Sequence, residues 1–184
     1  MRKPFLILLI LAFALTTTAF ASDDESKAEV FGGYSFLRAG SGTDLPGLST
    51  FNLHGWNASL SGFVHRNLGL TADFRGGYGS PEVLGLVSIK TRVHTFMGGP
   101  VLRVPTSKVT PFVHALFGGA HLSGEALGLS ASDTAFAWAT GGGVDVHLHR
   151  FFHIRVLQAD FVQTRFSETS QNHAQISSGL VLTF

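Results

Sequence analysis

The side chains best suited to covalent chemistry lie near the end of the chain. Histidine and serine close together on one segment could act as general base and nucleophile, and His173 with Ser177 or Ser178 is the nearest such arrangement. No acidic residue that could orient the histidine follows on that segment, and spacing alone establishes no triad geometry. We therefore predict no catalytic residue and no enzymatic activity.

A second group is formed by His147, His149 and His153, which lie around one predicted turn. His147 and His149 are two residues apart on an extended segment and could bind a divalent metal with a third ligand. Histidine rings are equally suited to a boundary that is apolar on one side and wet on the other, and this spacing is unspecific. The chain has no cysteine, which excludes disulfides and thiolate metal sites. We expect no metal and no cofactor.

A third group consists of charged residues that alternate with apolar ones. Ions removed from water are tolerated only when they are paired and hydrogen-bonded, so a mixture of both signs on one face predicts internal ion pairs. We predict that such a network lies in the lumen that the segments enclose. Its members are Asp73, Arg75, Lys90, Arg92, Asp145, Arg155 and Asp160.

The beginning of the chain has the pattern of a signal peptide. Met1-Arg2-Lys3 is positive, the apolar run from Phe5 to Leu15 is shorter than the ~20 residues of a membrane-spanning helix, and Ala19-Phe20-Ala21 is a small-x-small cleavage site. We predict a cleaved signal peptide over residues 1–21 and one domain over residues 22–184. Only 14% of the residues are charged, against ~25% in soluble domains, and the net charge of +1 offers no surface for nucleic acid.

Eight segments with alternating polarity follow, separated by turn residues, as in membrane-spanning β-strands. They run from Ala28 to Leu37, Phe51 to His65, Leu68 to Tyr78, Ser88 to Val104, Pro111 to Leu122, Thr134 to Leu148, Phe151 to Phe166 and His173 to Phe184. The alternation slips after Arg155, which predicts a β-bulge near Leu157. Exposed loops are expected at about 38–50, 79–87, 123–133 and 167–172, with short turns between the other segments. Long connections at one rim and short turns at the other are typical of outer-membrane barrels.

Two arrangements of the faces are compatible with this pattern. In a membrane barrel the apolar rows point to lipid and the ions point inward, whereas in a soluble lipocalin-like carrier the apolar rows enclose the ligand. The predicted leader favours the membrane barrel.

The last residues carry a more specific pattern. Ser177, Gly179, Leu182 and Phe184 stand where the terminal assembly signal of outer-membrane proteins has a polar residue, a glycine, a hydrophobic residue and an aromatic. With this signal the segment from Ala28 to Phe184 resembles the outer membrane protein β-barrel domain family, the group around the barrel of outer-membrane protein A. The resemblance implies an up-and-down barrel, both chain ends in the periplasm, a lumen blocked by side chains, and delivery by the barrel-assembly machinery. With 2 Trp and 2 Tyr the usual aromatic girdles would be thin.

The sequence thus predicts an all-β protein, a closed eight-stranded antiparallel up-and-down transmembrane β-barrel in the bacterial outer membrane. Its expected role is structural or surface interaction, with outer-membrane lipid around the barrel and an unknown extracellular partner at the loops. The alternatives are a narrow porin-like channel, a soluble periplasmic lipocalin-like carrier and a lipid A-modifying barrel enzyme.

Overall fold

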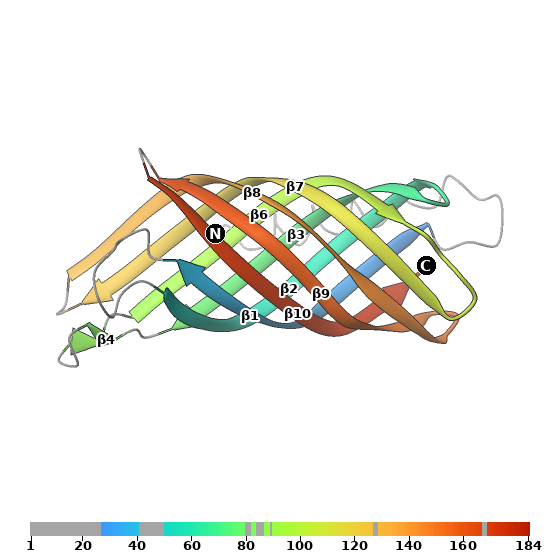
Figure 1. Ribbon diagram of the computed structural model, residues 1–184, viewed down its shortest axis with the longest axis horizontal. Helices are drawn as coiled ribbons and strands as arrows, with labels where there is room; N and C mark the ends of the chain where they lie inside the picture. Colours follow the sequence, from blue (N-terminus) through green and yellow to red (C-terminus); the bar gives the residue numbers. More distant parts are fainter. Residues whose placement is uncertain are drawn as a thin grey trace, which may run out of the picture.

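The computed structural model describes residues 27–40, 50–79, 82–83, 87–88, 90–126, 129–166 and 169–184, and the predicted signal peptide lies outside them. Eight strands in this part of the chain form a closed barrel (Figure 1). They are β1 (Ala28–Gly40), β2 (Thr50–His65), β3 (Leu68–Gly79), β6 (Lys90–Arg103), β7 (Val109–Ala126), β8 (Leu129–His149), β9 (Phe152–Phe166) and β10 (Thr169–Thr183). The short pair β4 (Glu82–Val83) and β5 (Val87–Ser88) lies beyond the end of the barrel opposite Phe184.

Every barrel strand pairs antiparallel with its neighbours in chain order, and β1 closes the barrel against β10. The closing ladder runs from Glu29 opposite Thr183 to Ala39 opposite His173. Closure satisfies the backbone hydrogen bonds of both edges, which is the condition for strands to lie in lipid. The prediction of an all-β, eight-stranded, up-and-down barrel is confirmed.

The described part of the chain contains no helical segment with the length and hydropathy that a membrane crossing requires.

Alternation along each strand separates an apolar outer wall from an interior that holds the ionised side chains and also an apolar cluster of Met97, Leu116, Ala120, Ala137, Ala139 and Val162. On β3, Leu70 is 64% exposed and points outward, whereas Asp73 is 2% exposed and points inward. The same holds on β10, where Ile176, Leu180 and Leu182 are exposed and Gln175 and Ser177 are buried. These exposed apolar rows therefore face away from the interior, which is the arrangement expected for a membrane barrel and the reverse of the one expected for a lipocalin-like carrier.

The predicted β-bulge in β9 is present. Gln158 pairs with Ser177 and Arg155 with Gly179, so two residues of β9 stand opposite Ser178 alone. Val156 and Leu157, the two residues between them, are both exposed. The bulge lets Arg155 and Gln158 both point into the barrel although three positions separate them.

Two of the predicted loops are largely strand. β7 and β8 stay paired up to Ala126 opposite Leu129, so most of the loop expected at 123–133 is a continuous ladder. β9 and β10 likewise pair up to Phe166 opposite Thr169, within the loop expected at 167–172. Small and polar residues suggested loops here, but backbone pairing with a neighbour that is already aligned overrides that local preference. Residues 41–49 of the first expected loop lie outside the described residues.

Candidate functional site

The barrel interior collects the ionised side chains that point inward from β3, β8 and β9. Of the residues predicted to form the lumen network, the structure buries Asp73, Arg75, Asp145, Arg155 and Asp160. All five lie at inward positions of the alternation. The side chain of Lys90 lies outside the described residues.

Arg92 was predicted to point into the lumen, and this prediction is wrong. Its side chain is exposed, because on β6 the even positions face outward, as Phe96 and Leu102 show, and the odd positions Met97 and Val101 are buried. The error came from assuming that polar residues always mark the lumen. Near the outer end of a strand, beyond the hydrocarbon, the outer wall is also wet and can carry charge.

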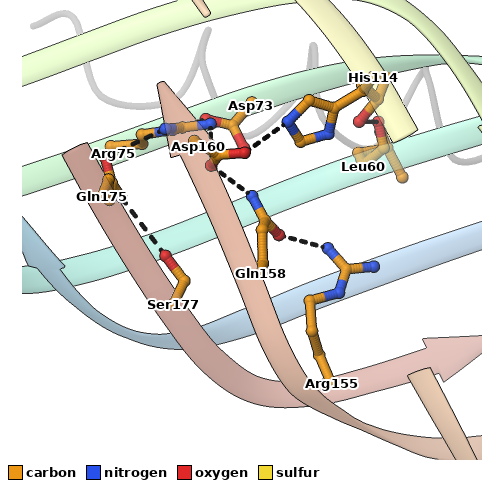
Figure 2. A network of polar contacts seen from close by, with 10 residues as sticks. Leu60, Asp73, Arg75, His114, Arg155, Gln158, Asp160, Gln175 and Ser177 are labelled. Carbon is orange, nitrogen blue, oxygen red and sulfur yellow. Dashed lines mark hydrogen bonds and ion pairs between the residues drawn. The ribbon is translucent and has the colours of Figure 1, made fainter. Parts of the chain in front are cut away.

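The first part of the interior network is centred on Arg75, which reaches across the lumen (Figure 2). Its Nε donates to Asp73 Oδ1, its Nη2 lies 2.9 Å from Asp160 Oδ2, and its Nη1 donates to Gln175 Oε1 at 3.0 Å. His114 Nε2 lies 2.8 Å from Asp160 Oδ1. Strands β3, β7, β9 and β10 are thus joined through side chains that meet in the middle of the barrel.

Gln158 connects this cluster to a second ion pair (Figure 2). Its Nε2 donates to Asp160 Oδ2 and its Oε1 accepts from Arg155 Nη1, both at 2.8 Å. Arg155 holds Asp145 with two parallel hydrogen bonds of 2.8 and 2.9 Å, the fork geometry that suits a carboxylate best. The Arg155 guanidinium also lies over the rings of Phe31 and Phe112, 4.3 and 4.1 Å from their centroids.

A third ion pair, Glu29 with Arg103, lies nearer the short turns and was missed by the sequence analysis. Arg103 Nε donates to the carbonyl of Arg66 in the turn between β2 and β3, and its guanidinium lies over the Phe63 ring. The signal was available, because the outward apolar row of β6 fixes Arg103 as inward by the same parity that turns Arg92 outward.

His114, Gln158 and Gln175 were also missed as network members. Each stands at an inward position next to residues that were assigned correctly, but neutral polar side chains carry no sequence signal for the ion they will contact. With them included, every buried carboxylate among the described residues contacts a cationic or histidine side chain.

Two cavities lie on either side of the Arg75 cluster. The one toward the short turns has about 10 Å³ and is lined by both ion pairs, Glu29 with Arg103 and Asp145 with Arg155. Such a space holds about one water molecule. The other, toward the outer end, has about 70 Å³ and is mostly apolar, with Arg75 and Gln175 at its base and His173 in its wall.

The histidine and serines considered for acyl transfer do not meet. His173 Nε2 is within 3.0 Å of Thr164 Oγ1, while Ser177 Oγ accepts from Gln175 Nε2 at 3.4 Å. Ser178 points to the outer wall and donates to the carbonyl of Arg155 at 3.0 Å. The arrangement offers no nucleophile hydrogen-bonded to a base at this place.

Of the three histidines near the turn after β8, His147 and His153 are in contact. A register shift lies between His147 and His149, and His147 stacks on His153 with ring centroids 4.1 Å apart. His147 Nε2 lies 2.8 Å from Thr110 Oγ1. Within the described ranges no group of three or more His, Cys, Asp or Glu is placed to hold a metal ion.

The residues of the predicted assembly signal lie on β10 and, for Phe184, directly after it, and their facing alternates along the chain. Leu182 and Phe184 are exposed on the outer wall, and Ser177 is buried inside. Gly179 faces β1 so closely that a Cβ there would lie 2.3 Å from the carbonyl oxygen of Gly32.

Comparison with known proteins agrees with this architecture. Similar solved structures include Neisserial surface protein A, with 13% identity, 88% of this chain and all of that chain covered, and a TM-score of 0.68. Ail, the attachment invasion locus protein of Yersinia pestis, has 18% identity, coverage of 86% and 100%, and a TM-score of 0.59. The N-terminal β-barrel domain of Pseudomonas aeruginosa OprF has 13% identity, coverage of 88% and 100%, and a TM-score of 0.53.

At these identities the likeness is one of fold, and no curated protein is significantly similar in sequence. The model of the outer membrane protein beta-barrel domain family, however, matches residues 5–184. The closed barrel, its apolar outer wall and this match together show that the chain belongs to the outer membrane protein beta-barrel domain family, a family of the bacterial outer membrane.

Proposed function

We propose that this protein is a non-enzymatic outer-membrane barrel with a structural or surface-interaction role, and that the ion network closes its lumen to solutes. The observation that carries the proposal is the contact of Arg75 on β3 with Asp160 on β9, extended by His114, Gln158 and Gln175 to other walls of the barrel. An eight-stranded barrel is just wide enough to be filled by side chains, so one connected layer is sufficient to block it.

The energetics favour a stable closure over a gate that opens readily. A passing ion would have to displace Arg75 from two carboxylates, and an unpaired buried charge is strongly destabilised. The cavity of about 10 Å³ on the inner side leaves room for little more than one water. The interior therefore favours a closed lumen over a narrow continuous water path.

The surface role rests on the outer ends of the strands. β8 is paired with β7 from Leu129 onward, whereas its ladder with β9 begins only at Phe136 opposite Arg165, so the β7–β8 hairpin projects beyond the β9–β10 hairpin. Hairpins that project from a barrel scaffold are suited to recognition outside the cell. Two proteins of similar fold are named a surface protein and an attachment protein, which supports the same kind of role here without identifying a partner.

The test of closure is conductance in planar bilayers. The unaltered protein should show no steady channel, and Arg75→Ala combined with Gln158→Ala and Asp160→Ala should raise the frequency of openings. The matched control combines Arg92→Ala with Arg165→Ala, which removes exposed guanidinium groups and should leave the barrel closed. Stable openings in the unaltered protein would contradict the proposal and favour a porin.

Insertion is measured on the same preparation. A folded membrane barrel should migrate differently in detergent gels before and after heating and should need detergent for extraction. Extraction by urea or salt alone would contradict a role in the membrane.

A further inference from the structure

The outer wall carries a polar and aromatic patch on one side of the barrel. We call it the outer patch; it consists of Tyr34 on β1, His54 and Trp56 on β2, Tyr78 on β3, and Arg92 and His94 on β6. It contains both tyrosines and one of the two tryptophans of the chain. Three of the four Trp and Tyr residues of the chain thus lie on three adjacent strands.

Strand register places the side chains of the outer patch beside one another. Tyr34 stands opposite Trp56, and Tyr78 stands opposite both His54 and Arg92. Directly opposed residues have their Cβ atoms within about 5 Å, so these groups form one surface. Trp56 lies over Gly76, where an added Cβ would be 2.5 Å from the indole Nε1, so the absence of a side chain at Gly76 makes room for the ring.

The hydrogen bonds of the outer patch leave donors facing outward. Tyr34 Oη bonds His54 Nδ1, and Tyr78 Oη bonds His94 Nε2 at 3.3 Å while Trp56 Nε1 donates to Tyr78 Oη at 3.5 Å. When Tyr34 and Tyr78 donate to the bonded imidazole nitrogens, each histidine accepts there and carries its N–H at the other ring nitrogen. In that tautomer His54 and His94 each keep an N–H donor, and the guanidinium of Arg92 adds further donors.

The outer patch also has a net positive character. Arg92 is exposed, and within the described residues no carboxylate pairs with it. Closer to the middle of the barrel the outer wall becomes apolar, and the ring centroids of Phe74 and Phe96 lie 4.9 Å apart there. The hydrogen-bond donors of the outer patch and the cation of Arg92 therefore lie at the outer border of the lipid-facing wall, where lipid headgroups lie.

We propose that the outer patch binds the phosphate-bearing headgroup of one outer-leaflet lipid, with Arg92 and the free N–H groups of His54 and His94 donating to phosphate oxygens. A phosphate has acceptor oxygens and negative charge, which complements a surface of donors and one unpaired cation. The acyl chains of the same lipid would lie along Phe74 and Phe96. The inference rests on the proposed membrane location and adds a lipid site to it.

The opposite wall provides an internal comparison. There Trp138 Nε1 donates to Gln163 Oε1 at 3.0 Å, and Gln163 Nε2 donates to Asn172 Oδ1 at 2.9 Å, so the polar groups bond one another. Arg165 is exposed on that wall, on the strand that carries Gln163. It supplies a matched arginine outside the outer patch.

The experiment uses the mature full-length protein in phosphatidylcholine nanodiscs that contain either diphosphorylated lipid A or lipid A with its phosphates removed. In a Trp138→Phe background the emission of Trp56 reports the outer patch. We expect saturable changes with the phosphorylated lipid alone, about tenfold weaker binding in Arg92→Gln with His94→Gln, and unchanged binding in Arg165→Gln.

Equal responses to both lipids, no response in the unaltered protein, or the same loss in Arg165→Gln as in the outer-patch variant would each overturn the inference. Heat-modifiable migration and the absence of conductance are recorded for every variant. A folded, closed barrel that fails to discriminate the two lipids refutes the lipid site alone, whereas a preparation that conducts or does not insert refutes the proposed function.

Discussion

Arg75 on β3 and Asp160 on β9 form an ion pair across the lumen, with Nη2 and Oδ2 2.9 Å apart. Their positions are far apart in the sequence, and only closure of the barrel brings them together. Asp73 and His114 complete the group, so that the guanidinium lies between two carboxylates and one of these also contacts an imidazole.

Removal of the central cation should destabilise the barrel strongly. Arg75→Met leaves Asp73 without its cation and Asp160 with only His114 and Gln158 as partners. We expect a loss of about 3–5 kcal/mol in the free energy of unfolding from vesicles, measured by urea titration. Asp160→Asn combined with Arg75→Met should lose less than the sum of the two single changes, because one unpaired charge disappears. Strict additivity in this cycle would show that the two side chains do not interact.

Gly141 packs against Asp160, so adding a side chain there should destabilise the barrel. In Gly141→Ala the new Cβ would lie 2.1 Å from Asp160 Oδ1 and 2.4 Å from the carbonyl oxygen of Ala159, so both the ion and the backbone of β9 must move. We expect a loss of about 1–3 kcal/mol in folding free energy. Gly32→Ala is the control, because no atom lies within 4 Å of its added Cβ. Similar effects of the two substitutions would contradict the packing described for Asp160.

The lipid-facing wall can be tested at Leu180, which is exposed on β10. Leu180→Arg should lower the folding free energy in vesicles by ~2–4 kcal/mol if the side chain lies near the bilayer midplane. Ser107→Arg in the exposed turn between β6 and β7 adds the same charge outside the hydrocarbon and should have little effect. A Leu180 variant as stable as the unaltered protein would place this face away from lipid.

The predicted assembly signal can be separated from folding at Phe184. Its backbone N–H donates to the carbonyl of Ala28, and its ring is exposed, so Phe184→Ser keeps the ladder while it removes the terminal aromatic. We expect less heat-modifiable protein in the outer membrane of expressing cells and unchanged refolding into vesicles. Phe151→Ser removes another exposed ring near the same rim and serves as the control. Equal accumulation of the two variants in cells would argue against a signal at Phe184.

Several features followed from the sequence because they depend on near neighbours. Alternating polarity has the period of a strand, so it identified the strands and, for most of them, the outward face. The bulge in β9 was visible as a slip of that period between Arg155 and Gln158, and the structure has it at Val156 and Leu157. The turn at Arg66 and Asn67 was visible for the same local reason.

Other features were decided only by the tertiary structure. The length of the β7–β8 hairpin depends on pairing between the two strands, for which the small and polar residues of this segment give no local signal. Which ions meet inside depends on the stagger between strands when the barrel closes, and this distance is not encoded in any one segment. The sequence by itself therefore determined strands, bulge and an ionised interior, whereas barrel closure selected Asp160 and Gln175 as partners of Arg75, because contacts across a lumen exist only after all the strands are in place.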